Sequence, residues 1–179
     1  MTLWLALILP LLAFADSFTG KVIAVTDGDT VKVLREGNVQ EKIRLLGIDA
    51  PEKKQAFGPQ SKEALSRKVF GKQVTVEFQK RDQYGRTLGK LILDGKDVNL
   101  TQVEEGFAWH YAQYKRQQLN TDVDLYATAQ NKAAAGKVGL WSKAEPTPPW
   151  DYRRERKLAN RKKKERTRKA HSWSDALSY

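Results

Sequence analysis

The feature that most limits the possible folds is a run of short valine- and leucine-rich segments, separated by glycine-containing turns, in the first half of the chain. Residues 21–25 and 30–34 are two such segments, and Asp27-Gly28 between them is a dipeptide typical of a tight β-hairpin turn. A third segment covers residues 41–48, with apolar and basic side chains on opposite faces. This order predicts a β-hairpin followed by a third strand.

A helix, two further strands and then more helices follow. Gly58-Pro59 is typical of a helix start, and this helix is expected to run to about residue 70. Residues 74–78 alternate between apolar and polar side chains and residues 88–93 form another apolar run, so both predict strands. Helices that end at glycines are predicted for residues 98–105 and 121–135. Five strands with one helix after the third indicate a mainly β protein with α-helices (α+β), namely a five-stranded OB-fold barrel with about three helices.

The first 15 residues have the character of a secretion signal. Residues 3–14 are apolar, and Ala13-Phe14-Ala15 supplies the small-x-small pattern that signal peptidase accepts. We therefore expect residues 1–15 to be a signal peptide, removed after Ala15, and the protein to be secreted or periplasmic. No Lys or Arg precedes the apolar stretch, which leaves an uncleaved anchor as the alternative. After cleavage no stable membrane span is expected.

The composition changes after the proline-rich segment 145–150, which predicts a domain boundary near Pro149. Residues 16–150 would form the folded domain, and residues 151–179 a basic C-terminal tail with eleven Lys and Arg against four acidic residues. Leu158 is the only large aliphatic residue between Arg153 and Ala170, so a helix there would lack an apolar stripe for docking. The tail is either a solvated segment or a contact for nucleic acid or the anionic cell envelope.

Charge and cysteine content limit the function further. The chain carries a formal net charge of +11, which indicates a polyanionic partner, either nucleic acid or an anionic membrane surface. It contains no cysteine, which excludes disulfide scaffolds, thiolate zinc sites and cysteine nucleophiles. Any bound metal is therefore expected to be a hard cation held by oxygen ligands.

Charged residues cluster in three segments, each at the end of a predicted strand, where side chains from different turns can converge. The segments are Asp27-Gly28-Asp29-Thr30, then Arg44 through Asp49-Ala50-Pro51-Glu52, and finally Asp82-Gln83-Tyr84-Gly85-Arg86. Convergence of Asp29, Asp49 and Glu52 would give an oxygen-only cation site. Ca²⁺ is the natural occupant of such a site because it accepts flexible coordination geometry.

Two arginines in these segments indicate a phosphate-containing substrate. Arg44 and Arg86 can each bind a phosphate group through paired N–H donors. A cation and two guanidinium groups together suit a phosphodiester, because its transition state carries additional negative charge. Glu52 is then the candidate base that accepts a proton from water.

Each segment also has an ordinary structural interpretation. Asp27-Gly28 is common in hairpins, and Asp49-Ala50-Pro51-Glu52 is typical of a helix entrance. Gly85-Arg86 can be a turn with a solvated arginine. The occurrence of all three segments in this order and spacing favours a functional site.

The three segments together closely resemble the staphylococcal nuclease (thermonuclease) family. The similarity extends more loosely through residues 95–106 and 139–142. It covers roughly residues 18–142 and excludes the basic tail.

The resemblance implies a metal site and a set of catalytic residues. Ca²⁺ would be held by the side chains of Asp29 and Asp49 and by the backbone carbonyl of Ala50. The residues that match the catalytic positions of the family are two phosphate-binding arginines and a water-activating glutamate, namely Arg44, Arg86 and Glu52.

The resemblance also implies the substrates. Members of this family cleave DNA and RNA and leave 3′-phosphate ends. Tyr84 matches a tyrosine near the phosphate, and Tyr114 is the candidate for stacking on a base. We expect a monomer. The alternative function is an OB-fold protein that binds nucleic acid without cleaving it and whose basic tail drives the association.

Overall fold

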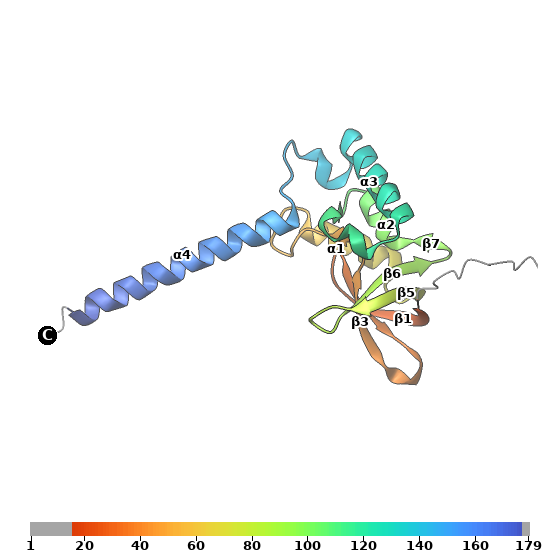
Figure 1. Ribbon diagram of the computed structural model, residues 1–179, viewed down its shortest axis with the longest axis horizontal. Coiled ribbons are helices and arrows are strands. Elements are labelled where there is room, and N and C mark those ends of the chain that lie inside the picture. Colours follow the sequence, from red (N-terminus) through yellow and green to blue (C-terminus); the bar gives the residue numbers. More distant parts are fainter. Residues whose placement is uncertain (1–15, 177–179) are drawn as a thin grey trace, which may run out of the picture.

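Five strands close into a barrel in the computed structural model, which describes residues 16–176 of the chain (Figure 1). The barrel strands are β1 (Asp16–Asp27), β2 (Thr30–Leu34), β3 (Gln40–Leu45), β5 (Gln73–Arg81) and β6 (Thr87–Leu93). Neighbours pair antiparallel in the order β3-β2-β1-β5-β6, and a parallel pairing between β3 and β6 closes the ring. This confirms the five-stranded OB-fold barrel. The proposed signal peptide, residues 1–15, lies outside the described residues.

Short elements complete the connections between the barrel strands within residues 16–176. The two-residue strands are β4 (Ile48–Asp49), β7 (Lys96–Asp97) and β8 (Trp109–His110). The 3₁₀ helices are η1 (Glu36–Asn38), η2 (Ala112–Gln117) and η3 (Gly139–Ser142). β4 pairs with β8 outside the barrel, and β7 pairs with β6.

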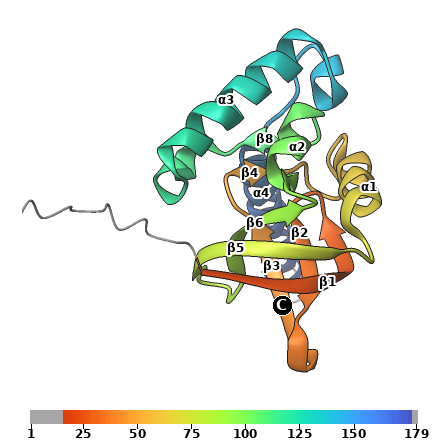
Figure 2. The same ribbon diagram turned by 90° about the vertical axis from the view of Figure 1, so that its right-hand side faces the viewer.

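Three helices pack on the barrel and on one another, as the sequence predicts. They are α1 (Gly58–Val69), which contacts β1, α2 (Val98–Glu104), which contacts β6, and α3 (Asn120–Ala135), which contacts α2. Figure 2 shows α3 on the outside of this layer, with α2 between α3 and the barrel. Leu65 and Val69, four residues apart on one face of α1, are fully buried. The barrel is thus covered by helices on one side.

Aliphatic side chains that alternate along the strands fill the barrel interior. Val31 and Val33 of β2, Val74 and Val76 of β5, and Leu91 of β6 are at most 2% exposed. Because successive side chains of a strand point to opposite faces, this spacing of two fixes which face of each strand is interior. Burial of each such side chain contributes about 1.5–3 kcal/mol to folding.

The third strand ends earlier than the sequence predicts, at Leu45 rather than at residue 48. Gly47 adopts a φ of 78°, a conformation that favours glycine, and the chain turns there. Ile48 and Asp49 consequently pair with β8 instead of continuing β3. The turn brings Asp49 back beside Arg44, which is part of β3 itself.

The described part of the basic tail lies in a single helix, α4 (Pro149–Ala176), that extends away from the barrel (Figure 1). Its side chains from residue 153 to residue 168 are exposed, including Leu158 at 44%. No helix within residues 16–176 is long and apolar enough to cross a membrane.

Asn99 of α2 ties the barrel to the segment that follows β3. Its side chain is fully buried, and its Oδ1 accepts a hydrogen bond from the Leu91 N–H at 3.1 Å. Its Nδ2 donates to the carbonyl oxygens of Leu46 at 3.0 Å and Gly89 at 3.1 Å. Asn99 therefore holds the turn that carries Asp49 in place.

Replacing Asn99 by alanine should lower the free energy of unfolding by about 2–4 kcal/mol, because buried backbone groups on three residues lose a hydrogen-bond partner. Denaturant titration followed by circular dichroism measures this change. The matched control is Asn131→Ala, at an exposed position of α3, which should not reduce stability. Equal stability of the two variants would show that Asn99 does not hold this junction.

Candidate active site

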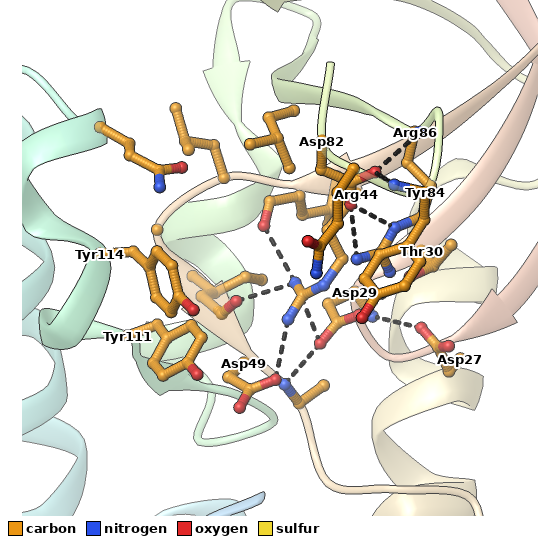
Figure 3. A pocket seen from close by; sticks show the side chains of 18 of the residues that line it. Asp27, Asp29, Thr30, Arg44, Asp49, Asp82, Tyr84, Arg86, Tyr111 and Tyr114 are labelled. Atoms are coloured by element: carbon orange, nitrogen blue, oxygen red, sulfur yellow. Dashed lines mark hydrogen bonds and ion pairs between the residues drawn. The ribbon is translucent and has the colours of Figure 1, made fainter. Parts of the chain in front are cut away.

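A pocket of about 810 Å³ opens among the loops at the ends of the barrel strands. The β1–β2 turn, the segment after β3, the β5–β6 turn, η2 and the first turn of α4 line it. Figure 3 shows Arg44 between Asp29 and Asp49, with Arg86 and Tyr84 on one side and Tyr111 and Tyr114 on the other. Every site residue proposed from the sequence lines this one pocket: Asp29, Arg44, Asp49, Ala50, Glu52, Tyr84, Arg86 and Tyr114.

The β1–β2 turn positions Asp29, which is 6% exposed. Its Oδ1 accepts a hydrogen bond from the Thr30 hydroxyl at 3.0 Å, and its Oδ2 accepts one from the Ala50 N–H at 2.7 Å. Its backbone carbonyl accepts a hydrogen bond from the Leu45 N–H at 2.8 Å. These bonds join the turn to the end of β3 and to the segment beyond it.

Arg44 bridges the two buried carboxylates. Its Nη1 lies 3.2 Å from Asp29 Oδ2, and its Nη2 lies 2.8 Å from Asp49 Oδ1. Nη1 also donates to the carbonyl oxygens of Leu45 at 3.1 Å and Ile48 at 2.8 Å. The guanidinium therefore fixes both the acids and the backbone of the turn after β3.

Asp49 and Glu52 meet an arginine from the C-terminal helix. Arg153 Nη2 lies 2.7 Å from Asp49 Oδ2, and Arg153 Nη1 lies 3.2 Å from Asp49 Oδ1 and 2.9 Å from Glu52 Oε1. The Asp49 side chain is 1% exposed and that of Glu52 33% exposed. Gly58 packs on the segment that carries Glu52 so closely that a Cβ there would lie 2.0 Å from the Glu52 carbonyl oxygen. A glycine is thus required at the start of α1.

The β5–β6 turn positions Arg86 on the other side of the pocket. Asp82 Oδ2 accepts a hydrogen bond from Arg86 Nε at 2.7 Å and lies 2.7 Å from Arg86 Nη2. Burial acts to raise the pKa of Asp82, but hydrogen bonds from Arg86 and from the Tyr84 backbone outweigh it and hold this pKa below its usual value. Tyr84 is 74% exposed, with the Arg86 guanidinium carbon 5.5 Å from the centroid of its ring.

Aromatic side chains form the wall opposite Arg86. Tyr111 and Tyr114 lie with ring centroids 4.7 Å apart, and Tyr114 is 48% exposed. The Trp150 ring, from the start of α4, stacks on Tyr111 at 5.2 Å with an interplanar angle of 7°. Burial and the nearby charge of Asp49 raise the pKa of Tyr111, so its phenol stays protonated.

Acidic groups outnumber basic groups around the β1–β2 turn. Burial and the charge of Asp29 raise the pKa of Asp27 to about 7. Burial also raises the pKa of Asp49, although Arg153 and Arg44 oppose this effect. The four carboxylates on this side belong to residues 27, 29, 49 and 52, and among the described residues the guanidinium groups of residues 44 and 153 are the basic groups that pair with them. A bound divalent cation would correct this imbalance.

The donor set fits a hard cation with a flexible shell, such as Ca²⁺. Within residues 16–176, no three histidine or acidic side chains are grouped so as to hold a metal ion. Asp29, Asp49 and Glu52 nevertheless line the same pocket, where Arg153 contacts both Asp49 and Glu52. A cation here would take two carboxylates and complete its shell with carbonyl oxygens and water, which Ca²⁺ accepts.

Sequence reasoning assigned no role to Asp82 and Arg153, the two charged pocket residues that pair with proposed catalytic residues. Asp82 is four residues before Arg86 in the third charged segment of the sequence analysis. Its ion pair with Arg86 could therefore have been predicted as a contact within a turn. Arg153 gave no local signal, because it is one of eleven basic residues in a tail that we expected to lie outside the folded domain.

Comparison with known proteins agrees with this geometry. The family model described as staphylococcal nuclease homologue matches residues 42–143. An uncharacterized endonuclease of Escherichia coli O157:H7 is 47% identical over 135 residues, which cover 75% of this chain and 84% of the relative. An uncharacterized endonuclease of Haemophilus influenzae is 40% identical over 140 residues, covering 78% and 75%. A micrococcal nuclease of Shigella flexneri is 36% identical over 162 residues, covering 86% and 90%. With its OB barrel and its arginine-lined pocket, this chain belongs to the staphylococcal nuclease family.

Proposed function

We propose that this protein is an exported, monomeric, Ca²⁺-dependent nuclease that hydrolyses phosphodiester bonds of DNA and RNA and leaves 3′-phosphate ends. One observation carries the proposal: Arg44, Arg86 and Glu52 line a single pocket together with the buried acids Asp29 and Asp49. Relatives named as an endonuclease and a micrococcal nuclease support the nuclease activity. The product ends and the use of Ca²⁺ are inferred from the family resemblance, and export from the character of residues 1–15.

The two arginines have donors to spare for a phosphate. Within the part of the chain that the structure describes, Arg44 uses three of its five N–H groups, on Leu45, Ile48 and Asp49. Arg86 turns Nε and Nη2 towards Asp82, and its side chain is 26% exposed. The two guanidinium groups can therefore bind phosphoryl oxygens from opposite sides and stabilise the charge that develops during hydrolysis.

Glu52 is the group best placed to accept a proton. Its carboxylate is one-third exposed, so water can reach it, whereas Asp29 and Asp49 are buried. In the proposed reaction Glu52 takes a proton from the attacking water while Arg44 and Arg86 hold the phosphoryl group. The water oxygen bonds to phosphorus as the bond to the 5′ oxygen breaks, and the departing 5′ oxygen takes a proton from solvent. Ca²⁺ held by Asp29 and Asp49 would act as a Lewis acid that polarises a phosphoryl oxygen.

The exposed aromatic residues suit a substrate that is not read by sequence. Tyr84 and Tyr114 line the pocket and are exposed, and stacking on a base contributes about 1–3 kcal/mol without distinguishing one base from another. This feature supports action on both DNA and RNA.

Glu52→Gln should reduce kcat by about 10²–10⁴-fold with little change in KM, because it removes the proton acceptor but keeps the size of the side chain. Arg86→Ala should reduce kcat by about 10²–10³-fold, because it removes donors that stabilise the transition state. Steady-state cleavage of single-stranded DNA measures both. Glu104→Gln, at an exposed position of α2, is the matched control. Turnover like that of the unmodified protein in Glu52→Gln would refute the assignment of Glu52.

Removal of the cation should abolish cleavage. We expect shortening of heat-denatured DNA and of RNA in Ca²⁺, none in chelator, and recovery when Ca²⁺ is returned. Chemical analysis of the new ends should find 3′-phosphates. Undiminished cleavage in chelator would rule out the metal-dependent mechanism.

The second candidate function is a nucleic-acid-binding protein that does not cleave. Helix α4 favours it, because its residues 153–168 are exposed and include ten Lys and Arg against two acidic residues. The charged residues of the pocket argue against it, since simple binding does not require Glu52 beside two buried acids.

Deleting residues 161–179 separates the two functions while it retains Arg153 and Trp150. A barrel nuclease should keep cleaving, with weaker substrate binding and a shallower dependence of log K on log salt concentration. The length-matched control is the full chain with glutamine at positions 161–164, which removes four of the seven basic residues of that segment and should also make the slope shallower. Loss of all activity on deletion, with the barrel still folded, would favour the tail-driven alternative.

A further inference from the structure

The first turn of α4 places a positive charge directly on the acids of the proposed metal site. The two terminal nitrogens of Arg153 contact both carboxylate oxygens of Asp49, at 2.7 and 3.2 Å, and one oxygen of Glu52 at 2.9 Å. Glu52 has no other side-chain ion pair within residues 16–176. Arg153 therefore joins the proposed base to a proposed metal ligand.

Several contacts hold this turn in place. The Trp150 ring stacks on Tyr111 and meets the edge of Trp109 at a centroid distance of 5.7 Å. Just before the helix, the carbonyl oxygen of Thr147 accepts a hydrogen bond from Gln55 Nε2 at 2.7 Å. The start of α4 is thus held against the pocket by aromatic stacking and hydrogen bonding in addition to ion pairs.

A guanidinium and a divalent cation cannot both occupy the face of Asp49 that Arg153 contacts. A cation needs lone pairs of the Asp49 carboxylate, and Arg153 already donates to both of its oxygens. Two positive charges within a few ångströms of each other at a buried carboxylate also repel strongly. Arg44 contacts only Oδ1 of Asp49, so Arg153 is the group that occupies Oδ2.

We infer that Arg153 is a residue of the active site that competes with the divalent cation for Asp49 and that must leave Asp49 and Glu52 when the cation binds. This inference rests on the proposed Ca²⁺ site. Coupling between two binding events is reciprocal. The contact of α4 with Asp49 and Glu52 therefore weakens cation binding, and the bound cation weakens this contact by the same factor. The position of the basic helix therefore depends on whether the divalent cation is bound.

Calorimetric titration with Ca²⁺ alone, in the full chain, tests the inference. Arg153→Ala should bind Ca²⁺ about tenfold more tightly than the unmodified protein, within the usual range of such couplings. Arg154→Ala is the matched control, because Arg154 lies in the same turn and pairs only with Asp151 in the described structure. Its affinity should stay within about twofold of the unmodified protein, since a distant exposed charge is screened.

A second variant and a second measurement cover the case in which Arg153→Ala perturbs the helix. Trp150→Ala keeps every charge but removes the stacking on Tyr111, so it should also tighten Ca²⁺ binding. Hydrogen exchange of the amides of residues 150–156 should become faster in the unmodified protein when Ca²⁺ is added, because the turn loses its contact with Asp49.

Three results would overturn the inference. Equal Ca²⁺ affinity in Arg153→Ala and the unmodified protein would show that the two do not compete, while leaving the Ca²⁺-dependent nuclease intact. An equal increase of Ca²⁺ affinity in Arg153→Ala and Arg154→Ala would show that the effect comes from the lower net charge and not from the contact with Asp49. If no variant binds Ca²⁺, the metal site of the proposed function fails, and the inference fails with it.

Discussion

The rest of the site depends on the guanidinium of Arg44, whose side chain is 13% exposed. An ion in this position is costly unless it is paired, and Arg44 pairs with Asp29 and Asp49 and donates to the carbonyl oxygens of Leu45 and Ile48. Those partners come from two separate turns, so the fold of both turns and the position of the arginine are mutually dependent. The same group is then both a structural brace and a proposed phosphate ligand. Substitution of Arg44 would perturb both roles at once, which makes Arg86 and Glu52 cleaner probes of chemistry.

The barrel could be predicted from the sequence because its signals are local. Alternation such as that of Val74 and Val76 identifies a strand and its interior face without knowledge of its neighbours. The end of the third strand could not be predicted in the same way. Apolar residues continue to Ile48, and only the positive φ of Gly47 and the pairing of Ile48 with His110, far along the chain, end the strand at Leu45. A local pattern does not show which distant segment competes for a strand.

The same distinction applies to the site. Asp29, Asp49 and Arg86 could be proposed because each lies at a turn whose chemistry is readable within a few residues. The sequence did not show which basic side chains would pair with the acids of the pocket. Glu52 lies in the same pocket as the other acids, but nothing near it in the sequence predicts its ion pair with Arg153, more than 100 positions away. Pairings across that separation depend on how the domain folds and have no signature in the neighbouring residues.

The placement of Arg153 follows from the electrostatics of the pocket. A cluster of acids strong enough to attract a divalent cation also attracts any basic side chain that can reach it. Helix α4 is rich in such side chains, and stacking of Trp150 on Tyr111 brings its first turn within reach. The tail therefore looks separate by composition but is anchored by the charge that the site requires. When one chain carries both an acidic metal site and a basic helix, the helix must either stay away from the acids or give them up when the cation binds. The contact of Arg153 with Asp49 favours the second arrangement, in which Arg153 and the cation take turns at Asp49.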